Sequence, residues 1–409
     1  MLRFLLAGLL LVLAAPGSRL GAQAATPDSA SATPPAPAAR PATKAWYEKL
    51  SMRGYSQIRY NRLLETNEDL NCAQCDRSIG RNGGFFLRRG RIILSGAVHP
   101  RVSIYIQPDY ASDAAGTQHY FQLRDAYFDL ALDTAKVHRL RFGQSKVPYG
   151  FENMQSSSNR LPLDRHDGLN SAVANERDLG LFYYWTPTVA QKRFENLLNG
   201  GLKGSGNYGV FALGTYNGQT ANRPEANNSS HVVARLTYPW QLPNGQFVET
   251  SVQAYRGRVV VPSVSSGVTR DAEYLDAREA VTLVWYAQPI GLVAEYNRGR
   301  GPQYDAATNS IVERPLSGGF VQAMYRWQHD GQVIQPFVRL HEYHGGKKVE
   351  LDARHYEVHE TEVGVEWLPF AAFELTVMYT NSDRLFEDFA TEGNRQRGSF
   401  LRLQAQFNY

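Results

Sequence analysis

The chain has 409 residues, of which 43% are hydrophobic and 20% are charged, and its formal net charge at pH 7 is +4. So small a net charge does not indicate nucleic acid or another polyanion as a partner. Beyond the N-terminal apolar run, no segment approaches the ~20 apolar residues of a membrane-spanning helix. Glycine (35) and tyrosine (23) are plentiful, which suits a transmembrane β-barrel, where half of each strand faces water and tyrosines gather at the membrane interfaces.

The N-terminus has the order of a secretory signal peptide. Arg3 precedes an apolar run from Phe4 to Ala15, and the small-residue triplet Ala22-Gln23-Ala24 follows. We predict that residues 1–24 form the signal peptide and that cleavage follows Ala24. The apolar run has only about a dozen residues, which is too short for a spanning helix.

The next part of the chain is expected to lack a core. Residues 25–45 are rich in Ala, Pro, Ser and Thr, a composition that predicts a disordered periplasmic segment, so the folded domain is expected at 46–409. Cys72 and Cys75 are the only cysteines. A small loop disulfide is the simplest interpretation in an exported chain, because no second pair of ligands completes a zinc site.

Apolar and polar residues alternate with a period of two through the middle of the chain, which indicates β-strands. Short breaks fall near residues 99–100, 133–134, 239–245, 289–291, 330–331 and 369–370. Longer polar stretches lie near 63–82, 111–118, 148–176, 218–229, 259–277, 300–316, 344–353 and 383–397. Alternating short turns and long loops predict an all-β fold, an antiparallel transmembrane barrel of sixteen strands. The long connection 187–206 leaves eighteen strands as the alternative.

A group of residues before position 220 carries a family resemblance. The stretch 142–166 begins as a strand containing Gly143-Gln144-Ser145-Lys146-Val147-Pro148-Tyr149-Gly150 and continues into a long polar loop. It resembles the phosphate-selective porin O and P family, and three further stretches fit in the same order: Phe86–Arg91, Arg124–Tyr127 and Gly209–Gly218. The resemblance implies a trimeric outer-membrane porin, a passive water-filled channel for small hydrophilic solutes. Its third extracellular loop, here 148–176, would fold inward and narrow the channel.

Basic residues on or near that loop are candidates for contacts with anions in a channel constriction. The candidates are Lys146, Arg160, Arg165, His166, Arg139, Arg141, Arg124 and Arg88. Arg139 and Arg141 share one strand face and are expected to point into the lumen. Guanidinium groups bind phosphate oxygens well, but nearby acids such as Asp129 and Asp164 could neutralise them as ordinary wall structure. Anion preference, for phosphate-like anions, therefore stays open.

Two consecutive arginines, Arg88 and Arg89, cannot both face the lumen of a regular strand. An arginine on the lipid face at mid-bilayer costs about 2–4 kcal/mol. We therefore expect a β-bulge here, or a position near the membrane edge.

The last strand, Phe400 to Tyr409, has an apolar face and a hydrogen-bonding face and ends on an aromatic residue. This pattern is typical of the closing strand of an outer-membrane barrel, although a sandwich strand could show it too. It also resembles the terminal signal that the outer-membrane assembly machinery reads. We expect that machinery, outer-membrane lipid and small anions or other hydrophilic solutes as partners, in the outer membrane of a Gram-negative-type bacterium.

Other functions have weaker support in the sequence. Ser156, Ser157 and Ser158 with His166 could suggest a lipid hydrolase, but they lack a Gly-x-Ser-x-Gly elbow. His355, Glu357 and His359 share one face of a predicted strand and could bind a metal weakly, although an extracellular wall patch is the simpler interpretation. A plugged structural barrel is the third alternative. We predict no enzymatic activity, no cofactor, no metal site and no nucleic-acid partner.

Overall fold

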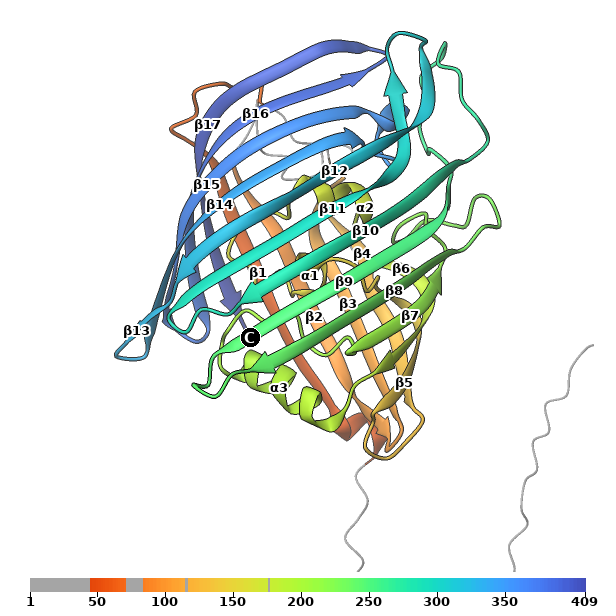
Figure 1. Cartoon of the computed structure of the whole chain (residues 1–409). Coiled ribbons are helices and arrows are strands. Elements are labelled where there is room, and N and C mark those ends of the chain that lie inside the picture. Colours follow the sequence, from red (N-terminus) through yellow and green to blue (C-terminus); the bar gives the residue numbers. More distant parts are fainter. Residues whose placement is uncertain (1–44, 71–83, 115–116, 176) are drawn as a thin grey trace, which may run out of the picture. The chain divides into compact units, whose positions relative to one another are not determined.

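The described part of the chain is a closed β-barrel (Figure 1). The computed structural model describes residues 45–70, 84–114, 117–175 and 177–409. The predicted signal peptide, nearly all of the predicted disordered segment, and both cysteines lie outside the described residues.

Seventeen strands make up one sheet. They are β1 (Leu50–Leu63), β2 (Phe85–His99), β3 (Val102–Ala114), β4 (Thr117–Ala131), β5 (His138–Lys146), β6 (Arg177–Trp185), β7 (Phe211–Tyr216), β8 (His231–Gln241), β9 (Phe247–Val259), β10 (Tyr274–Trp285), β11 (Ile290–Asp305), β12 (Ser310–Tyr325), β13 (Trp327–His329), β14 (Gln332–Gly346), β15 (His355–Phe370), β16 (Phe373–Asp388) and β17 (Thr391–Asn408). The helices are η1 (Trp46–Lys49), α1 (Phe151–Met154), α2 (Asp167–Ala172), α3 (Thr188–Asn199) and η2 (Leu351–Ala353).

Both β12 and β13 pair with β14, and a single residue, Arg326, separates them. They therefore form one interrupted strand, so the barrel has the sixteen antiparallel strands that the sequence predicts. The alternative of eighteen is wrong, because the connection that it relied on contains α3. The signal for this helix is the spacing of Ala190, Phe194 and Leu197, which lie on one buried face.

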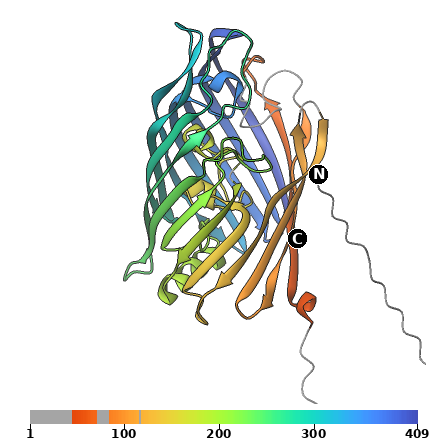
Figure 2. The ribbon, with the colours of Figure 1, turned by 90° about the vertical axis from the view of Figure 1, so that its right-hand side faces the viewer.

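Pairing of the first strand with the last closes the sheet (Figure 2). The register runs from Tyr55 opposite Asn408 to Leu63 opposite Leu401. Beyond it, Gly54 N donates to Tyr409 O at 2.6 Å, and Tyr409 N donates to Gly54 O at 3.0 Å. Closure leaves no sheet edge, and a bilayer core offers no water to satisfy one.

Side chains alternate between the two faces of the wall as the sequence predicts. In β17, Arg402, Gln404 and Gln406 are buried inside, whereas Phe407 on the other face is 54% exposed. Exposed aromatic residues gather next to the short turns: Trp240, Trp285, Trp327, Phe370, Phe407 and Tyr409. Such a girdle marks one membrane interface of an outer-membrane barrel.

Three of the expected long loops are wrong. The stretch 300–316 is mostly strand, with β11 and β12 joined by 306–309 alone. In 383–397 only 389–390 lie between β16 and β17, and in 111–118 only 115–116 lie between β3 and β4. These strand ends carry charged residues on the outer face, such as Arg300 and Arg395. The alternation of apolar and polar residues therefore ends before the hydrogen-bonded pairing of the strands ends. The expected short breaks are confirmed as turns.

The consecutive arginines occupy the expected bulge. Gln57 pairs with Arg89 and the next residue, Ile58, pairs with Leu87, so Arg88 is the extra residue on β2. Arg89 faces inward and is buried, and Arg88 is half-buried. The bulge lets the strand carry both charges without placing one in a regular lipid-facing position.

Removal of Phe407, Asn408 and Tyr409 is predicted to block assembly while leaving export intact. The deletion removes the end of the β1–β17 register and both hydrogen bonds to Gly54. Heat-modifiable electrophoretic mobility of protein in isolated outer membranes measures folding. A Phe389→Ala variant, altered at the far turn, serves as the control. Normal folding of the truncated chain would show that the terminal residues are dispensable.

A Gly54→Ala substitution is predicted to weaken closure of the barrel. A Cβ atom on Gly54 would lie 2.2 Å from Arg91 O and 2.5 Å from the ring of Tyr409, so backbone must move. Overpacking of this kind costs about 1–3 kcal/mol, which urea unfolding in lipid vesicles can measure. Gly84→Ala is the matched control, because a Cβ atom there meets nothing within 4 Å. Equal stability of the two variants would contradict the prediction.

Candidate functional site

The candidate site centres on residues 147–175, the segment that connects β5 to β6 and is called here the 147–175 segment. It contains α1 and α2, which lie between the walls of strands in both views (Figures 1 and 2). Gly150 precedes α1 at the N-cap position with a φ of +77°, a conformation that favours glycine. Almost all side chains of the segment are buried. A long connection without strands is therefore packed as tightly as a core.

Ser157 attaches the segment to the first two strands. Its hydroxyl lies 2.7 Å from Tyr55 Oη and accepts from Arg91 Nη1 at 2.7 Å. Its carbonyl accepts from Gln57 Nε2 at 3.1 Å. Three inward-facing side chains of β1 and β2 thus converge on one residue.

Asp164 makes a second attachment on the same side. It forms ion pairs with Arg59 of β1, at 3.3 Å, and with Arg402 of β17. Burial alone would raise the pKa of Asp164, but the charges of Arg59 and Arg402 hold it well below its ordinary value. The carboxylate therefore stays ionised between two arginines.

Glu152 and Asp167 attach the segment to other strands. Arg339 of β14 lies 2.9 Å from Glu152 Oε1 and also pairs with Glu362 of β15. Asp167 pairs with Lys347 at 2.5 Å and with Arg384 of β16 at 2.6 Å. In each case burial would raise the carboxyl pKa, and the adjacent cations lower it instead.

Most of the predicted anion contacts on or beside the segment donate hydrogen bonds to its backbone. Lys146 Nζ donates to Gln155 O at 2.5 Å, and Arg160 Nη2 donates to Glu152 O at 3.0 Å. Arg165 Nη1 donates to Val173 O at 3.3 Å. His166 Nε2 lies 3.0 Å from Glu295 of β11, and Arg124 of β4 donates to Asn175 O at 2.8 Å. Their role as anion contacts stays a prediction.

Arg139 and Arg141 point inward from β5 as expected, and both pair with Asp129 of β4. The guanidinium carbon of Arg141 lies 3.7 Å from the centre of the Tyr127 ring. Arg139 also donates to Asn207 O at 3.0 Å. This pair is therefore a separate, partly neutralised cluster, and Arg88 lies apart from it in the β2 bulge.

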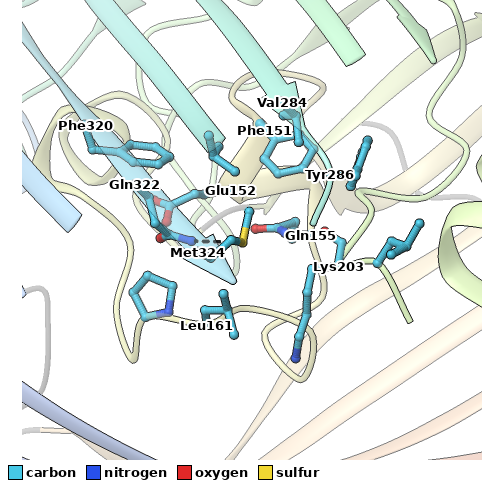
Figure 3. Close-up of a pocket in the computed structure, with 13 residues that line it drawn as sticks. Phe151, Glu152, Gln155, Leu161, Lys203, Val284, Tyr286, Phe320, Gln322 and Met324 are labelled. Atoms are coloured by element: carbon cyan, nitrogen blue, oxygen red, sulfur yellow. Dashed lines mark hydrogen bonds between the residues drawn. The ribbon is translucent and has the colours of Figure 1, made fainter. Parts of the chain in front are cut away.

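Part of the lumen is apolar, which the sequence did not predict. Inward side chains of β10, β11 and β12, among them Val284, Val293 and Phe320, pack with Phe151 and Leu161 of the segment. Figure 3 shows these groups around a small cavity, with Met324 and Tyr286 beside them. The available signal was Leu283-Val284-Trp285 and Leu292-Val293, where apolar residues occupy both strand faces near a short turn.

A second segment reaches this cluster from the end with the short turns. Lys203, which follows α3, pairs with Glu366 of β15 at 2.5 Å. Its carbonyl accepts from Gln155 Nε2 at 2.5 Å, and Gly204 O accepts from Asn159 Nδ2 at 3.1 Å. The two connections therefore meet between the walls, and sequence reasoning, which noted only the length of the second connection, did not predict that it enters the lumen.

The alternative sites that the sequence suggested differ in how far the structure brings their residues together. Ser156 bonds with Ser158, and His166 Nε2 contacts Glu295, so the hydrogen bonds of the suggested serine–histidine site go to other partners. Among the described residues two groups have metal-ligating geometry. One, Asp167 with His341 and Glu360, already holds lysine and arginine side chains. The other contains His344 in place of the expected His359.

Among the described residues, no helix combines the length and the apolar character needed to cross a membrane.

No curated protein sequence matches the chain. The outer-membrane channel DcaP of Acinetobacter baumannii shares 13% identity with a TM-score of 0.53, covering 88% of this chain and 97% of that one. The anion-selective porin of Comamonas acidovorans shares 9% identity with a TM-score of 0.53, covering 88% and 99%. The OmpT protein of Vibrio cholerae, in a trimer form, shares 9% with a TM-score of 0.52, covering 88% and 100%.

These structures share the barrel fold of the chain. The family model for phosphate-selective porins O and P matches residues 64–409, which include fifteen of the sixteen barrel strands in full. The chain is an outer-membrane porin of a Gram-negative bacterium and belongs to the phosphate-selective porin O and P family.

Proposed function

We propose that the chain forms a passive channel that the 147–175 segment narrows and that prefers anions. The observation that carries the proposal is the inward face of β1, β2 and β17. It bears four buried arginines, Arg59, Arg89, Arg91 and Arg402. A charge in a narrow, poorly screened channel acts on passing ions more strongly than one on the rim.

The carboxylates near these arginines offset only part of their charge. Asp164 is shared between Arg59 and Arg402, and Asp109 pairs with Arg91 at 2.9 Å. Arg89 donates to the neutral amide of Gln57 at 2.7 Å. Among the contacts of the described residues, three carboxylates, those of Asp109, Asp164 and Glu362, pair with these four guanidinium groups, and Glu362, at 3.5 Å from Arg402, is shared with Arg339. This excess of positive charge supports anion preference, for phosphate-like anions among others.

The attachments of the segment support its role as the constriction. It is held by β1, β2 and β17 through Ser157 and Asp164, and by β14 and β16 through Arg339 and Arg384. A chain fixed to so many strands must reduce the open cross-section. We propose that solutes pass between this segment and the arginine-bearing wall, without chemical change.

The proposal also covers the oligomeric state of the chain and its orientation in the membrane. Because the OmpT structure is described as a trimer form, we propose a homotrimer in outer-membrane lipid, with the short turns on the periplasmic side. The assembly machinery would read the closing strand. Residues 1–24 would be removed on export, and 25–45 would remain as the periplasmic segment that the composition predicts to be disordered.

A plugged structural barrel is the second candidate, and the apolar cluster favours it. Phe151, Leu161 and Phe320 fill part of the lumen, and the two connections meet there. Single-channel recording in a planar bilayer separates the candidates. Steady conductance supports the porin, and its absence from folded protein supports the plugged barrel.

An Arg89→Gln variant is predicted to shift ion selectivity toward cations. One unit charge 4 Å away attracts an anion and repels a cation by about 1 kcal/mol each even in water, so the anion-to-cation permeability ratio should fall by up to about thirtyfold. Reversal potentials under a salt gradient measure this ratio. Arg397→Gln, which changes a side chain 71% exposed on the outside, is the matched control. Equal shifts, or none, would mean that the β1–β2–β17 wall does not set selectivity.

An Arg339→Ala variant is predicted to loosen the segment and destabilise the barrel. The change leaves Glu152 and Glu362 buried without their shared cation, which typically costs about 3–5 kcal/mol. We expect noisier and larger single-channel currents, together with a lower unfolding midpoint in urea. Arg298→Ala removes an exposed pair with Glu279 and should change stability by less than about 1 kcal/mol. Similar effects of both changes would contradict this assignment.

A further inference from the structure

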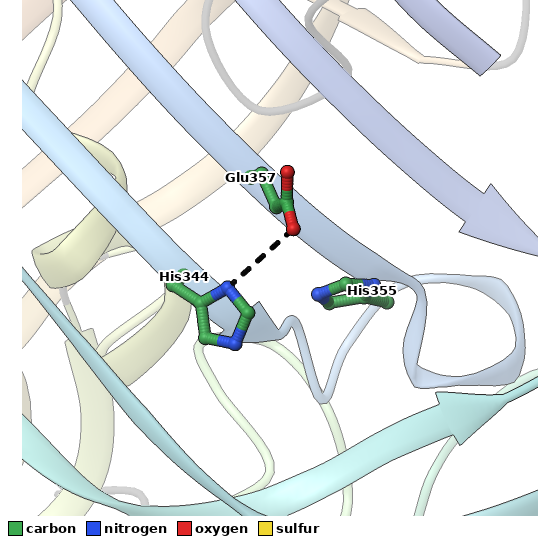
Figure 4. A group of neighbouring side chains, drawn as sticks. All are labelled: His344, His355 and Glu357. Carbon is green, nitrogen blue, oxygen red and sulfur yellow. Dashed lines mark ion pairs between the residues drawn. The ribbon is translucent and has the colours of Figure 1, made fainter. Parts of the chain in front are cut away.

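His344, His355 and Glu357 converge on the outer face of the wall where β14 ends and β15 begins (Figure 4). Each offers one ligand atom, and the three atoms lie within 4.8 Å of one another. The group is separate from the 147–175 segment, because its side chains point away from the lumen. It plays no part in the channel function proposed above.

Strand register brings the three residues together. His344 is directly opposite Glu357 on the neighbouring strand, and His355 lies two residues before Glu357 on the same face. The imidazole rings of His344 and His355 have centroids 5.2 Å apart and are nearly perpendicular. His344 Nδ1 lies 4.0 Å from Glu357 Oε1.

Neighbouring charges orient two of the three groups. Glu387 of β16 places Oε2 at 3.8 Å from His355 Nδ1, while His355 Nε2 is buried and has no hydrogen-bond partner. Arg395 of β17 lies 3.5 Å from Glu357 Oε2, which leaves Oε1 toward His344. A carboxylate on the far nitrogen of a histidine is the usual outer support of a metal ligand.

We propose that His344, His355 and Glu357 bind a divalent transition-metal ion of the zinc type. Two imidazole nitrogens and one carboxylate oxygen suit Zn²⁺ or Cu²⁺, whereas Mg²⁺ and Ca²⁺ prefer oxygen alone. Bonds of about 2.0–2.2 Å to a tetrahedral ion would draw the ligand atoms to about 3.4 Å from one another. The side chain of His344 is 59% exposed and can rotate to make this adjustment. Water would occupy the fourth position.

The proposal differs from the pattern visible in the sequence, which placed His359 with His355 and Glu357. His359 lies on the same outward face of β15 but is opposite Glu342, two cross-strand pairs further along the ladder. It is therefore a matched control, since it has the same residue type, strand and face. His344 becomes a ligand candidate only through the pairing of β14 with β15.

Isothermal titration of the tag-free, detergent-folded porin with Zn²⁺ tests the site. We expect one saturable site per chain in the unaltered protein and in His359→Ala, and no saturable binding in the His344→Ala, His355→Ala double variant. Heat-modifiable mobility confirms that each variant is folded. Absence of binding to the unaltered protein, persistence in the double variant, or loss in His359→Ala would each overturn the proposal.

Two further measurements identify the ligands. Electron paramagnetic resonance of the Cu²⁺-loaded porin should show superhyperfine splitting from two imidazole nitrogens, and the splitting should disappear in the double variant. Glu387→Gln should weaken Zn²⁺ binding by about tenfold without abolishing it, as expected for an outer-shell carboxylate. A Cu²⁺ spectrum that is the same in the double variant would place the ion elsewhere.

Discussion

The pairing of β1 with β17 is the constraint on which the rest of the structure depends. In hydrocarbon, an unpaired backbone N–H or C=O costs several kcal/mol, so a sheet that crosses the membrane must have no free edge. Closure fixes which face of every strand meets lipid. It also encloses the inward side chains, and those that the 147–175 segment covers are buried from water, so charges among them are paired.

Those enclosed charges determine where the 147–175 segment lies. Glu152 meets Arg339, and Asp164 lies between Arg59 and Arg402. Pairs of this kind add little net stability, because desolvation offsets their attraction. Breaking one is costly, however, so the pairs select one arrangement of the segment and exclude others. The apolar cluster around Phe320 supplies the close packing that ion pairs cannot.

The sequence predicted the strand number, the closing strand and the bulge at Arg88, because alternation and turn residues are local signals. It overestimated loops where outward charges interrupt the pattern, as at Arg300. It could not show that Lys146 and Arg160 bond to the backbone carbonyls of Gln155 and Glu152, since spacing along an irregular segment does not reveal how the segment folds back on itself. The apolar cluster was missed for a related reason. An apolar side chain such as Val284 on the inward face can be explained only once Phe151 is known to belong to the same cluster.

The attachments of the 147–175 segment also constrain the order of assembly. Gln57 donates to Ser157 O, and Gln406 donates to Ser158 O, so adjacent residues of the segment are bound by the first and the last strand of the barrel. Neither set of bonds is complete until the wall has closed. Contacts so distant in sequence form late and slowly. We therefore expect the segment to reach its final position only after β1 and β17 have paired.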